Sequence, residues 1–372
     1  MALKASSIKK AKKECSGLFG IKHSNRTTDN HWGKNCFNSS FPTAVACYML
    51  ANDIPAIYNK LVNVGNKLKV VSSEISLRDV FNCGAMKLDE LDFRFESKYE
   101  PYQLFSFDTI DSIDLVIKTI NNEFLTPLEI KLTVLPTSNT SNLPETEWGC
   151  ELVVRSATTS YCALGMFDSV KHDASTVRSI FEAACSSIGS WTNDFEMCHK
   201  TPLLIECINT FQRKYLDRQK PLLIQTVWKT QGQSPTLADN AFDIIVWSDY
   251  AFSRLFLDNT LITGQTMSRP MRASAKLARC LWELSKSGKI RLGDIYRQMA
   301  FDTQTDKEFA IQGTKWRSYI SSTRIVQPIL HKNVINNIIE PGYIERLRPE
   351  RRFDQTLYFA NLLIGQDKKV DQ

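Results

Sequence analysis

Two neighbouring stretches of the chain carry the pattern of β-strands. Residues 113–118 form a mainly apolar run that contains Asp114 near its start. In residues 128–134, apolar and polar positions alternate with a period of two, which predicts a strand with one buried face. Glu129 and Lys131 both fall on the polar face of that second strand, so their side chains point the same way.

The segment between these strands favours a tight turn. Asn121-Asn122 follows the first run, and asparagine tolerates the left-handed backbone that such turns need. We therefore expect an antiparallel hairpin, in which Asp114 comes near Glu129.

Further strands are expected where short apolar runs are bounded by polar turns. Residues 222–228 and 242–247 are the longest of these runs, and we expect them to form central strands of a sheet. Residues 152–154 and 161–164 predict shorter strands.

Helical periodicity marks four other segments. They are residues 43–61, interrupted at Pro55, and residues 74–81, 175–188 and 268–286. Ser72 or Ser73 is expected to cap the second helix, and Ser287-Gly288 closes the fourth. Strands and helices together predict an α/β fold with a mixed central β-sheet flanked by helices.

Composition narrows the classes of protein that remain. The 372 residues are 43% hydrophobic and 23% charged, and no apolar run approaches the 18 residues of a membrane span. The lysine-rich start lacks the apolar core of a signal peptide, so the cytoplasm is expected. Ten cysteines include no C-x-x-C pair, which argues against a zinc site or a disulfide scaffold. The net charge of +6 permits a polyanionic partner.

Asp114, Glu129 and Lys131 have the spacing of a PD-(D/E)xK nuclease site, although Ser112-Ile113 stands where that motif often has proline. Two carboxylates at one strand edge can hold a hard divalent ion, which lowers the pKa of bound water and offsets charge on the phosphate. Lys131 would orient the attacking water or the scissile phosphate. The alternative is an ordinary amphipathic strand with Glu-x-Lys on its wet face.

Other carboxylates compete for the metal. Glu74 is a candidate third ligand if a helix ahead of the hairpin brings it close, and the alternative is an exposed first-turn glutamate favoured by the helix dipole. Asp108 and Asp111 compete with Asp114, which we prefer because it lies at the mouth of the apolar strand.

Three segments offer contacts to DNA. Polar loops rich in glycine and asparagine carry Lys22, Asn25, Arg26, Lys34, Asn35 and Asn38, and a second loop carries Lys229 and Gln231. The helix over 268–286 places Arg269, Arg272, Lys276 and Arg279 on one face, suited to a phosphate backbone. The alternatives are ordinary polar loops and a solvated helix face.

Several blocks of sequence resemble the HindVP/HgiDI family of type II restriction endonucleases. These blocks are Leu18-Phe19-Gly20, Ser24-Asn25-Arg26, Trp32-Gly33-Lys34-Asn35 and Phe37-Asn38-Ser39-Ser40-Phe41-Pro42. The Glu-Ile-Lys-Leu-Thr stretch of the family corresponds to Glu129 through Thr133. Cys36 stands where the family more often has glutamine, so no base contact is carried over to it.

The resemblance implies a PD-(D/E)xK core with a loop-rich N-terminal addition and a helical C-terminal addition. We expect a DNA-contacting segment over 1–60, the nuclease core over 61–260 and a basic helical region over 261–372. It further implies an Mg²⁺-dependent homodimer that cuts duplex DNA at a short palindrome of the GRCGYC type, by in-line attack of metal-bound water. A cognate DNA methyltransferase in the host would accompany it, without a stable complex.

Two other functions remain open on the residues alone. A sequence-specific DNA-binding protein without catalysis would use the basic residues but give Glu129 no task, because a carboxylate beside phosphate is repulsive unless a cation intervenes. A repair-type metal nuclease would share the hairpin but cut without a palindromic site.

Overall fold

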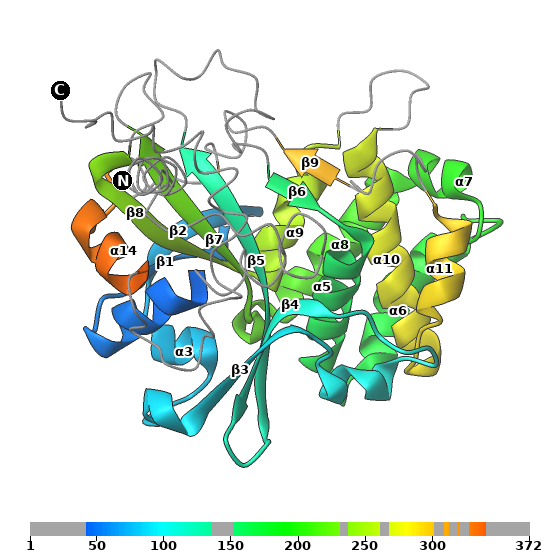
Figure 1. Ribbon diagram of the computed structural model, residues 1–372. Coiled ribbons are helices and arrows are strands. Elements are labelled where there is room, and N and C mark those ends of the chain that lie inside the picture. The colour runs from blue at the N-terminus through cyan, green and yellow to red at the C-terminus, as the bar shows by residue number, and fades with distance from the viewer. Residues whose placement is uncertain are drawn as a thin grey trace, which may run out of the picture.

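The computed structural model describes residues 42–135, 152–230, 237–260, 268–300, 309–311, 319 and 327–339. Within these ranges an eight-stranded mixed β-sheet stands between two layers of helices (Figure 1). Seven strands follow the order β2-β1-β8-β7-β5-β4-β3, and β10 pairs with β8 beside this path. The expected fold class, a mixed central sheet flanked by helices, is confirmed.

The strands of the main sheet have the following bounds. They are β1 Ala56–Val64, β2 Lys67–Ile75, β3 Leu91–Ser97, β4 Ile113–Thr119, β5 Phe124–Leu135, β7 Pro221–Thr230, β8 Leu237–Ser248 and β10 Leu330–His331. A separate two-stranded sheet pairs β6 (Leu152–Val154) with β9 (Phe309–Ile311). The pairs β1/β8 and β5/β7 are parallel, whereas β1/β2, β3/β4, β4/β5 and β7/β8 are antiparallel.

The expected hairpin forms between β4 and β5. Leu115 pairs with Leu128 in an antiparallel register, and the turn between the strands places Asn122 in the left-handed region at φ 71°. The amide of Asn122 donates to the carbonyl of Thr119 at 2.9 Å and closes the turn. Asparagine adopts this backbone more readily than most residues, because its short polar side chain hydrogen-bonds locally.

The two longest apolar runs form the centre of the sheet, as expected. Residues 222–227 on β7 and 241–248 on β8 are buried. Both faces of these strands are covered by helices, which is why their sequence reads as a continuous apolar run rather than an alternation.

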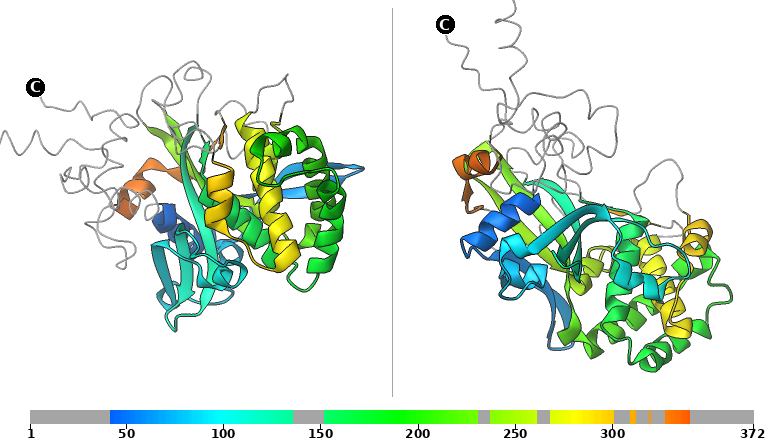
Figure 2. Two further views of the ribbon diagram at one scale, coloured as in Figure 1. Left: turned by 90° about the vertical axis from the view of Figure 1, so that its right-hand side faces the viewer. Right: turned by 60° about the horizontal axis from the view of Figure 1, so that its bottom comes forward.

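A thick layer of helices covers one face of the sheet (Figures 1 and 2). Its members are α5 Ser156–Asp168, α6 Ala174–Cys185, α7 Asp194–His199, α8 Thr201–Lys214, α9 Asp249–Leu257, α10 Arg269–Ser287 and α11 Leu292–Gln298. They pack against Val116, Leu223 and Trp247 of the sheet in one apolar core. The fourth predicted helix is confirmed as α10, which Ser268 caps and Gly288 ends with φ 74°.

The opposite face carries a smaller layer. A helix over residues 42–51, α3 (Leu77–Phe81) and α14 (Lys332–Ile339) pack there against Leu115, Ile130 and Ile244. Short 3-10 turns, η2 Leu88–Glu90, η3 Glu100–Phe105 and η4 Leu216–Arg218, complete the described elements.

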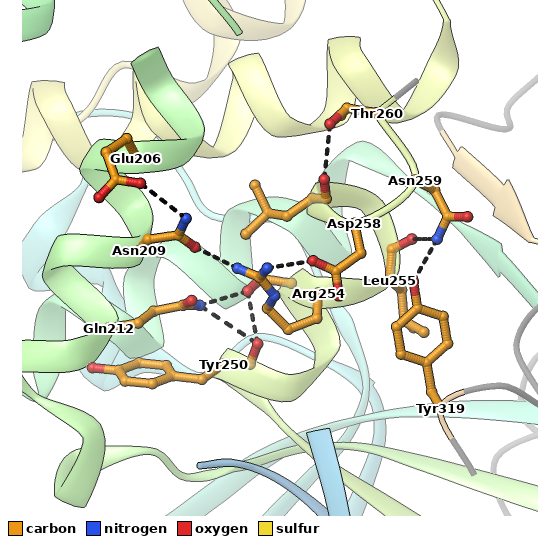
Figure 3. Close-up of polar contacts among 12 residues, drawn as sticks. Glu206, Asn209, Gln212, Tyr250, Arg254, Leu255, Asp258, Asn259, Thr260 and Tyr319 are labelled. Carbon is orange, nitrogen blue, oxygen red and sulfur yellow. Dashed lines mark hydrogen bonds and ion pairs between the residues drawn. The ribbon is translucent and has the colours of Figure 1, made fainter. Parts of the chain in front are cut away.

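Buried polar contacts hold helices α8 and α9 together (Figure 3). Arg254 of α9 donates to Oδ1 of Asn209 on α8 at 2.5 Å and forms an ion pair with Asp258. Gln212 of α8 donates to the hydroxyl of Ser253 at 2.7 Å. These contacts give partners to some of the polar groups that the helix layer removes from water, although Oε1 of Gln212 and Nε of Arg254 stay buried without one in the described part of the chain.

Three local predictions are wrong. The helix expected over 43–61 ends at residue 51, because the backbone before Pro55 disfavours the helical region and the following residues pair as β1. Residues 72–75, expected to cap and begin the helix over 74–81, form the end of β2 instead, and α3 begins at Leu77. Residues 161–164, expected as a strand, lie inside α5.

The described part of the chain holds no helix long and apolar enough to cross a membrane.

Candidate active site

A row of charged side chains crosses three adjacent strands. Its members are Glu96 of β3, Asp114 of β4, and Glu129 and Lys131 of β5. The register that pairs Leu115 with Leu128 sets Asp114 of β4 beside Glu129 of β5. The amide of Ile130 donates to Oδ2 of Asp114 at 2.8 Å and holds that carboxylate at the point where β4 and β5 part. The hairpin thus brings the carboxylates of Asp114 and Glu129, which are 15 residues apart in the sequence, close together in space.

Lys131 lies between the two carboxylates. Its ammonium forms an ion pair and hydrogen bond with Oε1 of Glu129 and lies 3.8 Å from Oδ2 of Asp114. The side chains of Asp114, Glu129 and Lys131 are 22%, 8% and 19% exposed. They are thus largely withdrawn from water yet remain open to a ligand.

Glu96 of β3 extends the row and was missed by the sequence reasoning. The β3–β4 register pairs Phe95 with Leu115 and Ser97 with Ile113, which sets Glu96 across from Asp114. Its backbone is left-handed, with φ 48°. Such a backbone is unusual for glutamate and clusters at functional sites. The alternation of apolar and charged residues over 91–96 was the signal that marks this strand.

Helix α5 supports the site from the helix layer. The hydroxyl of Thr158, in its first turn, donates to Oε1 of Glu129 at 2.9 Å. Lys276 of α10 donates to the hydroxyl of Ser156 at 2.8 Å, which ties the start of α5 to its neighbour. Arg155, the residue before the helix, is exposed.

Burial and like charge shape the acidity of the row. Burial, and then the nearby Glu129, raise the pKa of Asp114 to about 7, against the opposing effect of Lys131. Burial and Glu129 also raise the pKa of Glu96. Burial acts to lower the pKa of Lys131, but the two carboxylates outweigh it and the pKa is raised. The three carboxylates thus repel one another unless a cation lies among them.

The donor set fits a hard divalent ion. The ammonium of Lys131 is within ion-pair distance of both Asp114 and Glu129, so the two carboxylates face one cation-sized space. Among the described residues, no group of three or more His, Cys, Asp or Glu side chains is arranged as a metal cage. Two carboxylates with remaining positions left to water and phosphate are the usual provision for Mg²⁺.

Other predicted carboxylates lie elsewhere. Glu74 sits on β2 rather than at a helix start, since Ser76 caps α3 in place of Ser72 or Ser73. Pairing through β1, β8 and β7 places Glu74 four strands from Lys131, or about 19 Å at the usual strand spacing.

Asp108 and Asp111 are also engaged elsewhere. Asp108 accepts from the amide of Gly293 at 3.1 Å, and Asp111 accepts from the hydroxyl of Tyr296 at 2.7 Å. Both carboxylates therefore hold α11 in place.

The basic face of α10 is not an exposed stripe. Lys276 and Arg279 are 1% and 6% exposed, because α10 packs among α5, α6 and α8. Arg279 donates to the carbonyl of Trp191 and to Gln298. Arg269 and Arg272 at the start of the helix are half-buried.

The remaining candidates for DNA contact fall mostly outside the described residues. These are Lys22, Asn25, Arg26, Lys34, Asn35, Asn38 and Gln231. Lys229 is half-buried near the end of β7, where it pairs with Leu135.

The mixed sheet, its two helix layers and the charged row at the β4–β5 hairpin define a restriction-endonuclease-like core. Residues 32–364 match the HindVP restriction endonuclease family. The chain belongs to this family and is a type II site-specific deoxyribonuclease, which acts on double-stranded DNA and requires a divalent metal.

Two relatives agree with this assignment. The chain is 33% identical to the type II restriction enzyme HgiDI of Herpetosiphon aurantiacus, over 92% of this chain and 95% of the relative. It is 32% identical to the probable type II restriction enzyme HindVP of Haemophilus influenzae, over 93% and 94% of the two chains. No solved structure matches the chain.

Proposed function

We propose that this restriction endonuclease cuts both strands of a short palindrome in duplex DNA, with Asp114 and Glu129 as ligands for Mg²⁺ and Lys131 as the third catalytic residue. The observation that carries the proposal is the convergence of both carboxylates on the ammonium of Lys131. An amphipathic strand with a solvated Glu-x-Lys face would leave these side chains exposed and apart.

The chain's own residues have distinct tasks in this proposal. Thr158 and the amide of Ile130 fix the orientation of the two carboxylates. The ammonium of Lys131 orients water and the scissile phosphate for in-line attack. Bound Mg²⁺ would supply a water of lowered pKa and offset the growing negative charge on phosphate. The products are a 5′-phosphate and a 3′-hydroxyl.

The recognition site is proposed to be of the GRCGYC type, on the resemblance in sequence. Its two half-sites favour a homodimer, because each protomer then presents one charged row to one strand. Base and phosphate contacts are proposed for Lys22, Asn25, Arg26, Lys34, Asn35, Asn38, Lys229, Gln231, Arg269 and Arg272. A host that carries this enzyme needs a methyltransferase that protects the same sites.

Plasmid digestion with Mg²⁺ tests the catalytic residues. We expect Glu129→Ala and Lys131→Ala to abolish cleavage while both variants still bind duplex DNA in Ca²⁺. Matched controls are Glu123→Ala on the exposed hairpin turn and Lys69→Ala on β2, which remove the same charges away from the site. Cleavage retained by both site variants would overturn the assignment.

Mapping the cut ends tests the recognition site. Discrete cuts at GRCGYC-type palindromes are expected, whereas scattered nicks would favour a repair-type nuclease. Light scattering of the protein on a duplex with one mapped site should give two chains for each duplex. One chain on that duplex would count against the homodimer.

A further inference from the structure

Arg155 stands at the junction between β6 and α5, beside the charged row. Its carbonyl accepts from the amide of Thr159 at 3.2 Å, so its backbone already belongs to the first helical turn. Thr158, three residues on, contacts Glu129. Three residues of α-helix rise only about 4.5 Å, which is within the reach of an arginine side chain.

The backbone of Arg155 is held firmly relative to the row. Thr158 anchors the first turn of α5 to β5, and Lys276 anchors Ser156 to α10. Before it, Val154 of β6 is buried in the core and pairs with β9. Arg155 is therefore presented from a fixed point rather than from a free loop.

The guanidinium of Arg155 is available to a ligand. The side chain is exposed and does not cap the helix that it precedes. Within the described ranges, no hydrogen bond or ion pair engages it. Its charge nevertheless reaches the row, because it acts to lower the pKa values of both Glu96 and Lys131, against the larger effects that raise them. A cation close to carboxylates but unpaired with them is free to meet an anion from outside.

We infer that Arg155 binds the non-bridging oxygens of the scissile phosphate and stabilises them as the reaction proceeds. This inference rests on the proposed function. The attacking water releases a proton to bulk water as its oxygen bonds to phosphorus, the bond to the 3′-oxygen breaks, and that oxygen takes up a proton from bulk water. Arg155 keeps its protons throughout, and its planar fork suits two oxygens of one phosphate. The ammonium of Lys131 contributes a point charge, and the planar guanidinium of Arg155 donates two parallel hydrogen bonds in a fixed geometry.

Substitution of Arg155 separates charge from geometry. We expect Arg155→Ala to lower the turnover number on a plasmid with mapped sites by about 10- to 100-fold, with a smaller change in KM. Arg155→Lys should recover part of that loss, since it restores the charge without the fork. Arg297→Ala on α11, which removes an exposed arginine far along the chain, is the matched control. Thermal unfolding of each variant identifies any loss of folding.

A substituted duplex shows whether Arg155 meets the scissile phosphate itself. Binding in Ca²⁺ is measured on a duplex with one mapped site and on the same duplex with a methylphosphonate at the scissile position. The ratio of wild-type to Arg155→Ala affinity should be about 10 on the first duplex and near 1 on the second. Equal ratios on both duplexes would overturn the inference.

The two proposals fail in different ways. A wild-type protein that leaves plasmid DNA intact with Mg²⁺ contradicts the proposed function. A wild-type protein that cuts, together with an Arg155→Ala variant that cuts equally well, contradicts only the role of Arg155.

Discussion

The hydroxyl of Thr158 on α5 donates a hydrogen bond of 2.9 Å to Oε1 of Glu129 on β5. This contact joins the helix layer to the charged row of the sheet. Glu129 is almost fully buried, so its carboxylate depends on partners inside the protein for orientation.

Thr158→Val removes this hydrogen bond while keeping the shape of the side chain. We expect a loss of about 1–3 kcal/mol in the free energy of unfolding, because the buried carboxylate loses one of the two donors to its Oε1, the other being Lys131. If Glu129 holds the metal as proposed, cleavage should fall by about 10- to 100-fold, the usual effect of removing a group that orients a metal ligand. Denaturant titration and plasmid cleavage measure the two effects. Thr158→Ser keeps the hydroxyl and should retain most activity; a serine variant as weak as valine would argue against the hydrogen bond.

Glu96 combines a strained backbone with a position opposite Asp114. Glu96→Gly accepts the left-handed backbone, whereas Glu96→Ala keeps the strain. The glycine variant should therefore be more stable than the alanine variant by about 1 kcal/mol. Both variants lose the carboxylate, so both should bind Ca²⁺ more weakly than wild type in calorimetry. If Ca²⁺ affinity falls only in the less stable alanine variant and not in the glycine variant, Glu96 has a structural role and does not bind the metal.

The hairpin could be predicted from sequence because its signals are local. Alternation over 128–134 fixes which residues share a face, and Asn121-Asn122 fixes where the chain turns. Together they were enough to bring Asp114 and Glu129 together. Glu96 carried an equally clear alternation, but its place in the row depends on the β3–β4 register, which no single strand reveals.

The helical half of the site could not be predicted in the same way. Helix α5 is buried from Thr158 to Phe167 on every side, so it lacks the polar face from which helical periodicity is recognised. The face of α10 that carries Lys276 is misleading for the opposite reason. Its charges repeat as on a solvated helix, yet neighbouring helices cover them and supply hydrogen-bond acceptors.

Burial of Lys276 leads to a prediction about DNA binding. Lys276→Met keeps the unbranched shape of the side chain, one atom shorter, but removes the hydrogen bond to Ser156. We expect the slope of log affinity against log salt to stay unchanged, because this ammonium is not presented to phosphate. A lysine that neutralises a phosphate contributes about one unit to that slope. Filter binding in Ca²⁺ over a salt series measures it, and a slope reduced by one unit would place Lys276 on the DNA.

Asp249 makes the stability of the fold depend on pH. It is the first residue of α9 and is 2% exposed. Its Oδ1 accepts from the amides of Lys220 and Tyr250, while its buried Oδ2 has no partner among the described residues. Burial raises its pKa to about 7 from an ordinary value of 3.8.

Asp249 therefore stays protonated in the folded protein at pH values where the unfolded chain has released the proton. Its favourable contribution is complete below about pH 4 and is lost as the pH rises through 7, up to about 4 kcal/mol. Asp249→Asn keeps an acceptor for both amides and cannot ionise. Denaturant titration should thus show that the free energy of unfolding of the asparagine variant, relative to that of wild type, is larger at pH 8 than at pH 5. Asp53→Asn, at an exposed turn, is the control and should show no such gain. If the difference between wild type and Asp249→Asn is the same at both pH values, Asp249 is already ionised in the folded protein at pH 5 and burial does not raise its pKa.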